Sequence, residues 1–178
     1  QRLKFFILTS QRQNSIDFSF TEPFFLNRDL AMSTDIFKTI RQFPESNYDN
    51  ETDGFGIGIG YANGEYGRQN IKYNLENRNI IAYDGASNSI VSESGKNILS
   101  LLTLGNVVDK TNSRIDPSDG WFFSNSVGLA GFGGDKRYIK INGTLASYNL
   151  IFNEKVTFSI VGKSGYVIGL GQDIEISD

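Results

Sequence analysis

Residues 55–61 read Phe-Gly-Ile-Gly-Ile-Gly-Tyr, and this stretch decides the fold class. Large apolar residues occupy every odd position and glycine every even one, which is the two-residue period of a β-strand. Glycine weakens a strand unless the strand bends or another backbone approaches closely, so a face of three glycines suits the inside of a curved barrel wall. A bend in a soluble β-sandwich is the alternative explanation.

The same alternation recurs along a chain that contains 19 Gly and 3 Pro. Apolar and polar residues alternate at 15–20, 71–76 and 156–160, and less regularly at 120–130, where Asn125 interrupts the apolar face. No segment shows a convincing capped helical period. We therefore predict an all-β, antiparallel chain of nine strands, at 3–9, 14–21, 29–39, 54–62, 68–83, 97–110, 120–130, 136–150 and 155–169.

The lengths of these strands and of their connections favour a membrane barrel. Several strands exceed the usual 5 to 6 residues and match the roughly 9 to 11 residues that cross a bilayer at a tilt. Compact turns are predicted near 22–28, 63–67, 113–119 and 151–154, and long polar connections at 40–53 and 84–96. Because such barrels have short periplasmic turns and longer extracellular loops, we assign the compact turns to the periplasm. The connections at 10–13 and 131–135 are short exceptions.

Composition excludes most other function classes. The 178 residues carry a formal net charge of −3 and contain neither His nor Cys. The absence of both residue types removes disulfides, thiolate nucleophiles, imidazole bases and the usual zinc ligands. Lys and Arg are scattered singly, so no basic surface for nucleic acid is expected. No apolar run is long enough for a membrane helix, and residues 1–20 lack the order of a signal peptide.

Two patterns could indicate a ligand site, and each has a simpler explanation. The glycines at 54–60 superficially suggest a dinucleotide loop, but they are spaced by two and no helix follows. Scattered carboxylates could bind calcium, although their spacing is not that of an EF-hand and Asp commonly caps turns. We therefore predict no metal and no cofactor. These carboxylates are Asp109, Asp116, Asp119, Asp135, Asp173, Glu175 and Asp178.

Four turn motifs, in order along the chain, resemble those of BamA-type outer-membrane assembly factors, the bacterial surface antigen family. Residues 17–25 resemble the family's strand end followed by an acidic residue, proline and aromatics, and residues 63–66 resemble its Asn-Glu-Tyr turn, although residues 61–62 depart from that motif. Residues 112–121 resemble a turn with Pro and Gly before the next strand, and residues 131–138 the Gly-rich reversal of alphaproteobacterial members. The site residues in these motifs are Glu22, Pro23, Phe24, Asp116, Pro117, Gly120, Gly131, Gly133, Gly134 and Asp135.

The resemblance implies a sixteen-stranded barrel of the bacterial outer membrane, preceded by POTRA domains, that folds and inserts other outer-membrane proteins. We expect residues 1–178 to be part of that barrel domain, with no POTRA domain present, and the residues above to have structural roles without catalysis. The implied partners are the lipid bilayer, client outer-membrane proteins and accessory lipoproteins. A passive porin-like channel and a soluble β-sandwich binding domain remain as alternatives.

Overall fold

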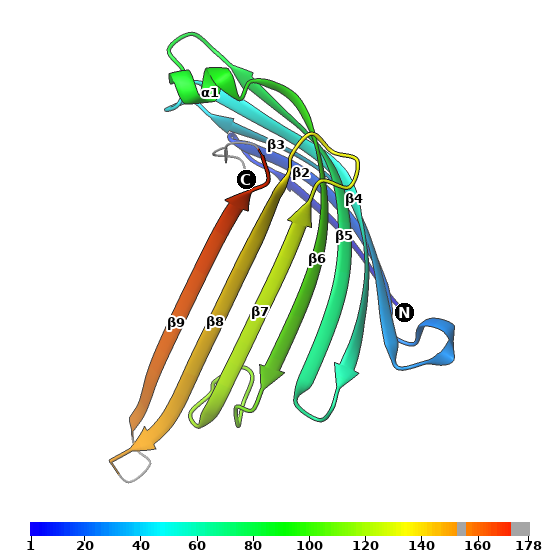
Figure 1. Cartoon of the computed structure of the whole chain (residues 1–178), viewed down its shortest axis with the longest axis vertical. Coiled ribbons are helices and arrows are strands. Elements are labelled where there is room, and N and C mark those ends of the chain that lie inside the picture. Colours follow the sequence, from blue (N-terminus) through cyan, green and yellow to red (C-terminus); the bar gives the residue numbers. More distant parts are fainter. Residues whose placement is uncertain (153–155, 172–178) are drawn as a thin grey trace.

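A computed structural model describes residues 1–152 and 156–171, which form one antiparallel sheet of nine strands in the order β1-β2-β3-β4-β5-β6-β7-β8-β9 (Figure 1). Every strand pairs with its neighbours in the sequence, so the sheet is a simple meander. The strands are β1 (Arg2–Thr9), β2 (Gln13–Glu22), β3 (Leu30–Phe43), β4 (Tyr48–Asn63), β5 (Gly67–Ala82), β6 (Gly95–Asp109), β7 (Gly120–Ala130), β8 (Tyr138–Ile151) and β9 (Val156–Gly169).

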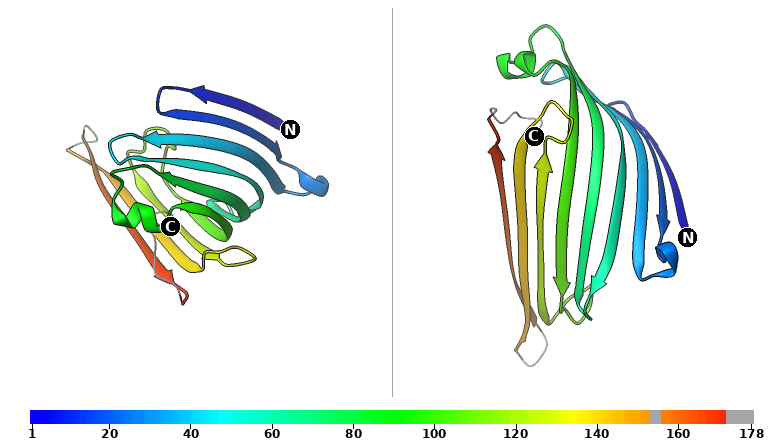
Figure 2. Two further views of the ribbon diagram at one scale, coloured as in Figure 1. Left: turned by 90° about the horizontal axis from the view of Figure 1, so that it is seen from above. Right: turned by 45° about the vertical axis from the view of Figure 1, so that its right-hand side comes forward.

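The sheet is strongly curved, and the view from above shows its strands following an arc (Figure 2). In β4, Phe55, Ile57 and Ile59 are exposed on one side, whereas Gly56 and Gly58 are buried on the other. We call the side of Phe55 and its partners in register the outer face, and the side of Gly56 the inner face. The predicted bare glycine face is therefore present, and side chains from adjacent strands crowd over it.

The described residues form a single sheet, with no second sheet packed against either face. This arrangement contradicts the sandwich alternative, which needs two facing sheets about 10 Å apart. β1 and β9 lie at opposite edges and do not pair with each other. Among the described residues, no helix is long and apolar enough to span a bilayer.

The predicted long connection at 40–53 is wrong. β3 continues to Phe43 and β4 begins at Tyr48, so only residues 44–47 connect them. The ladder continues through this polar region, with Thr39 opposite Thr52 and Arg41 opposite Asn50. The prediction failed because a segment with polar residues on both faces resembles a loop in sequence. These strand ends are polar on both faces because neither face makes apolar contacts there.

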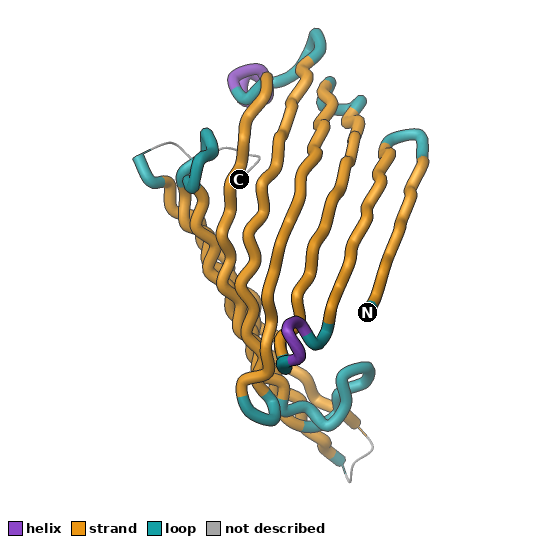
Figure 3. Tube along the Cα trace, turned by 90° about the vertical axis from the view of Figure 1, so that its right-hand side faces the viewer, coloured by secondary structure: helices purple, strands orange, loops and turns teal. Residues whose placement is uncertain are grey.

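The structure also contains two short helical segments that the sequence did not predict (Figure 3). α1 (Asn88–Ser92) lies in the connection between β5 and β6, where the Ser87 side chain accepts a hydrogen bond from the Ile90 N–H at its start. The 3-10 turn η1 (Phe25–Asn27) lies between β2 and β3 and includes a left-handed residue, Leu26. Both are too short to show a helical period, so pattern analysis could not find them.

Candidate functional site

The outer face is a continuous apolar surface. Rows of cross-strand partners such as Phe5–Phe18, Ile36–Phe55 and Leu104–Val127 run across it, and most of these side chains are exposed. The described buried apolar residues, by contrast, are few and mostly small or on the inner face: Ile80, Leu99, Ala130, Tyr138 and Ala146. Soluble monomers rarely expose contiguous apolar patches above a few hundred Å². A hydrocarbon solvent therefore has to take the place of a protein core on this face.

The apolar part of the outer face ends within the longest strands. Beyond Phe55, the outer side chains of β4 are carboxylates, at Asp49, Glu51 and Asp53, and each accepts a hydrogen bond from β5 or the residue after it. Tyr83, in the connection after β5, donates to Asp49 at 2.9 Å, and this bond raises the pKa of Tyr83. A strand of 16 residues is about 50 Å long and exceeds a bilayer core of about 30 Å, so these ends extend into water.

A row of polar and small residues crosses the outer face between apolar rows. Gln69, Asn106, Asn125, Gly143 and Ser164 are successive partners across β5 to β9. The Asn106 amide donates to the Asn125 side-chain oxygen at 3.3 Å, and a further hydrogen bond joins Gln69 to the Tyr61 hydroxyl. Polar groups that face lipid are costly unless paired, and these hydrogen bonds lower that cost.

The inner face uses the glycines of β4 as a passage for side chains. Lys72 on β5 lies opposite Gly58 and forms an ion pair of 2.8 Å with Asp35, which belongs to β3 and lies opposite Gly56. The two charges therefore meet across an intervening strand. A Cβ at Gly56 would lie 3.0 Å from Lys72 Cε and 2.7 Å from the Asn74 side-chain oxygen. Glycine leaves room here for the polar side chains of both neighbouring strands, which fold over β4.

The first predicted motif lies at the end of the sheet that contains the β2–β3, β4–β5 and β6–β7 connections. Glu22 is the last residue of β2, and its carboxylate accepts a hydrogen bond from the Phe24 N–H at 3.1 Å. Pro23 and the exposed Phe24 line a hollow of about 510 Å³ together with residues of β3 to β6, most of them on the inner face. The motif therefore contributes a proline and an exposed aromatic ring to this hollow.

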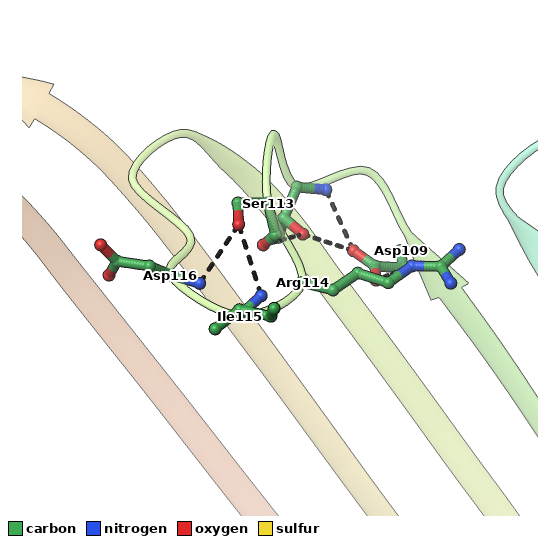
Figure 4. Close-up of polar contacts among 6 residues, drawn as sticks. Asp109, Ser113, Arg114, Ile115 and Asp116 are labelled. Carbon is green, nitrogen blue, oxygen red and sulfur yellow. Dashed lines mark hydrogen bonds and ion pairs between the residues drawn. The ribbon is translucent and has the colours of Figure 1, made fainter.

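The connection between β6 and β7 is held by its own polar groups (Figure 4). The Ser113 hydroxyl accepts hydrogen bonds from the N–H groups of Ile115 and Asp116, and Thr111 donates to Asp109 at 2.6 Å. The side-chain oxygen of Asn112 accepts two further hydrogen bonds across the loop, from the N–H groups of residues 118 and 119. Asp116 and Pro117 thus lie in an ordered turn. Ile115, at its tip, is 98% exposed.

Gly120 ends this connection with a φ of +100°, a backbone conformation that favours glycine. A Cβ there would collide with the carbonyl oxygen of Lys110. The glycine lets the start of β7 approach the end of β6, where the Lys110 N–H donates to the Trp121 carbonyl at 2.9 Å.

The glycine-rich reversal lies at the opposite end of the sheet and completes the edge of β6. The β6–β7 ladder ends at the Leu101–Ala130 pair, and the connection then supplies the missing hydrogen bonds. Gly131 N–H donates to the Ser100 carbonyl, while Asp135 N–H and the Asp135 carboxylate pair with the two backbone groups of Ile98. Through Gly131 and Asp135, the connection therefore continues the hydrogen bonding of β6 beyond the end of β7. Gly133 has a φ of +93° and Gly134 packs against β6.

The predicted motifs are thus divided between two ends of the sheet and do not form one site. No cluster of three potential metal ligands occurs in the part of the chain that the structure describes. Asp109 instead pairs with Thr111 and Arg114, and Asp135 with the β6 backbone. Asp173, Glu175 and Asp178 lie outside the described residues.

The Omp85 superfamily domain matches residues 1–178. The chain belongs to this superfamily. Among solved structures, the Omp85 chain is similar to "the crystal structure of BamA from Haemophilus ducreyi lacking POTRA domains 1-3", with a TM-score of 0.82 and 16% sequence identity. The similarity covers 95% of this chain and 36% of that one, so the chain spans about a third of the length of the protein it matches. A comparison with curated proteins finds no match.

Membership in this family identifies the nine strands as part of a transmembrane β-barrel of the bacterial outer membrane. The predictions of superfamily, fold class and location are confirmed, whereas the resemblance to alphaproteobacterial members stays a prediction. Sequence reasoning did not find the Lys72–Asp35 pair or the polar row of the Omp85 chain. The individual residues gave no signal, because both features depend on strand register, which brings together positions up to several dozen residues apart.

Proposed function

We propose that the chain forms part of a barrel domain that helps other outer-membrane proteins fold and insert, and that it does so through its surfaces and without chemistry or a cofactor. Family membership supports this role. The bilayer and client outer-membrane proteins are its proposed partners, with accessory lipoproteins binding elsewhere on the assembled protein. In this proposal, client strands pair with strand edges of the barrel by β-augmentation.

The observation that carries the proposal is the narrow apolar band at β5. The uninterrupted run of outer apolar residues on β5 extends from Ile71 to Leu75, between Gln69 and Asn77, and Ile81 is a separate outer apolar residue near the end of the strand. Four residue steps span about 13 Å along the strand, against an apolar band about 25 Å tall in ordinary outer-membrane barrels. A bilayer that meets this wall has to thin locally, because hydrophobic mismatch has an energetic cost. Thinning lowers the barrier for a client strand to enter.

The test reconstitutes the full-length protein into lipid vesicles and adds an unfolded outer-membrane protein. The fraction of the client that folds is followed by its changed gel mobility before boiling. We expect faster client folding than in protein-free vesicles, with the largest gain in lipids of long acyl chain, where the untreated bilayer resists insertion most. No acceleration in any lipid would contradict the assembly role.

A passive channel is the second candidate, because the inner face is polar along β3 to β5. Its residues include the Lys72–Asp35 pair and the Glu76–Arg78 pair, with an N–O distance of 2.9 Å in the latter. Planar-bilayer conductance separates the two functions. Steady ion current without accelerated client folding favours the channel, whereas acceleration by itself favours assembly.

A further inference from the structure

We propose that Lys110, Tyr66 and Trp121 form a binding site for the phosphate of an anionic phospholipid. The site lies on the outer face, at the end of the sheet that contains the β4–β5 and β6–β7 connections. We call these three residues the lysine cradle. The proposal goes beyond client assembly, since it concerns a specific lipid contact of the barrel wall. It rests on membrane placement and not on the assembly role.

The geometry of the lysine cradle is that of a cation held between two aromatic rings. Lys110 Nζ lies 5.4 Å from the centroid of the Tyr66 ring and 5.5 Å from that of the Trp121 ring. Both distances are within the roughly 6 Å range of cation–π interactions. The three residues come from the ends of three neighbouring strands, so the site exists only in the folded sheet.

Backbone hydrogen bonds fix the cradle in place. The N–H of Asp109 donates to the Tyr66 carbonyl at 3.0 Å, and the N–H of Lys110 donates to the Trp121 carbonyl at 2.9 Å. Gly120 permits this approach, as described above. The Tyr66 hydroxyl donates to Glu65, and this hydrogen bond raises the pKa of Tyr66. The backbone at both aromatic residues is therefore held by the sheet, and the hydrogen bond to Glu65 orients the Tyr66 ring.

The ammonium group of Lys110 retains capacity for an anion. Within the described part of the chain, no carboxylate lies within ion-pair distance of it, in contrast to Lys72, which pairs with Asp35. Its side chain is exposed, and an ammonium carries three donors, which aromatic faces satisfy only weakly. The indole N–H of Trp121 likewise has no acceptor among the described residues and can join the same ligand.

The position of the cradle indicates the source of the anion. Val108 and Trp121 are the last apolar residues of the outer face at the ends of β6 and β7, and Lys110 follows directly. Aromatic residues and lysines at the margin of an apolar band lie at headgroup depth. The phosphate there belongs to a lipid, and an anionic lipid is favoured because a zwitterionic headgroup brings its own ammonium toward Lys110.

The test uses the full-length protein in detergent and counts bound lipid by native mass spectrometry. Phosphatidylglycerol and phosphatidylcholine of equal chain length are added in turn, to wild type, Lys110→Gln and Lys110→Arg. Lys96→Gln is the matched control, since Lys96 is an exposed outer-face lysine at the other end of the same strand. One lysine near an anionic surface contributes about fivefold in affinity. We expect Lys110→Gln to weaken one phosphatidylglycerol site by about that factor, with Lys110→Arg and Lys96→Gln close to wild type.

Three results would overturn the proposal. The first is unchanged phosphatidylglycerol binding in Lys110→Gln, and the second is equal binding of phosphatidylcholine at the affected site. The third is displacement of the lipid by millimolar inorganic phosphate, which would show a site for soluble phosphate. Client folding by Lys110→Gln is measured in parallel. Loss of the lipid site with normal client folding supports the cradle while leaving the assembly proposal untouched.

Discussion

Replacement of glycine by alanine should destabilise the fold at three positions of the predicted turn motifs, for a different reason at each. Comparing the three variants therefore tests which feature of each turn matters for stability. Gly133 has a φ of +93° but open space around its Cβ position. Gly134 has an ordinary φ, yet a Cβ there would lie 2.6 Å from the Ile98 carbonyl oxygen and 2.9 Å from the Ser100 nitrogen. Gly120 combines a φ of +100° with a collision against the Lys110 carbonyl.

The expected losses follow from these differences. A non-glycine residue at positive φ costs about 1 to 3 kcal/mol, and alanine recovers about 0.4 to 1 kcal/mol through the unfolded chain. Gly133→Ala should therefore cost about 1 kcal/mol. Gly134→Ala must displace the reversal and weaken two hydrogen bonds of 2.7 Å between Asp135 and Ile98, at about 1 kcal/mol each. Gly120→Ala has both penalties, and we expect about 3 to 4 kcal/mol.

The assay is urea unfolding of the full-length protein in detergent, with the folded fraction read from gel mobility before boiling. The midpoints should fall in the order wild type, Gly133→Ala, Gly134→Ala, Gly120→Ala. If Gly133→Ala is as damaging as Gly120→Ala, the collision with the β6 end has no energetic weight and the reasoning is refuted. Equal, negligible losses in all three would mean that neither turn is held as the structure describes.

Three further predictions concern the two faces and the water-exposed strand end. Ile57→Lys places a charge on the lipid-facing side and should cost about 2 to 4 kcal/mol, whereas Ser126→Lys on the inner face should cost less than about 1 kcal/mol; equal urea midpoints would contradict the assignment of the faces. Asn106→Leu and Asn125→Leu should show a coupling of about 0.6 kcal/mol in a double-mutant cycle, with the double variant at least as stable as wild type; additive losses would exclude the amide pair. Tyr83 has a raised pKa in the folded state because it donates to β4, so its stabilising contribution is present below about pH 10 and is lost as pH rises through the folded-state pKa. Urea midpoints should therefore fall more steeply at alkaline pH in wild type than in Tyr83→Phe, and parallel curves would refute this.

The sequence predicted most of the strands because alternation is a local property of each segment. In β4, the alternation from Phe55 to Tyr61 predicts a strand with one lipid-facing side, whichever strands lie next to it. The same reasoning failed from Tyr48 to Asp53, where the strand is polar on both sides. Only backbone pairing with β3 and β5 shows that this segment is a strand, and pairing leaves no mark on composition.

The candidate sites show the same division more strongly. Motif order along the chain indicated which turns matter, but it could not reveal that the reversal at 131–135 hydrogen-bonds to β6 or that Gly120 brings Trp121 to Lys110. The lysine cradle has no signature in the sequence, because its three residues are separated by up to 55 positions. They meet only through the registers of the β5–β6 and β6–β7 pairs.

The sequence by itself therefore determined the apolar strand segments, the two-faced wall and the class of solvent that each face requires, since each follows from the period-two arrangement of side chains along single strands. The tertiary structure decided which residues meet across strands: Lys72 with Asp35 over the glycines of β4, and Lys110 with two aromatic rings. The physical reason is that cross-strand partners are set by register, and register depends on the hydrogen bonds and turn lengths of the whole sheet.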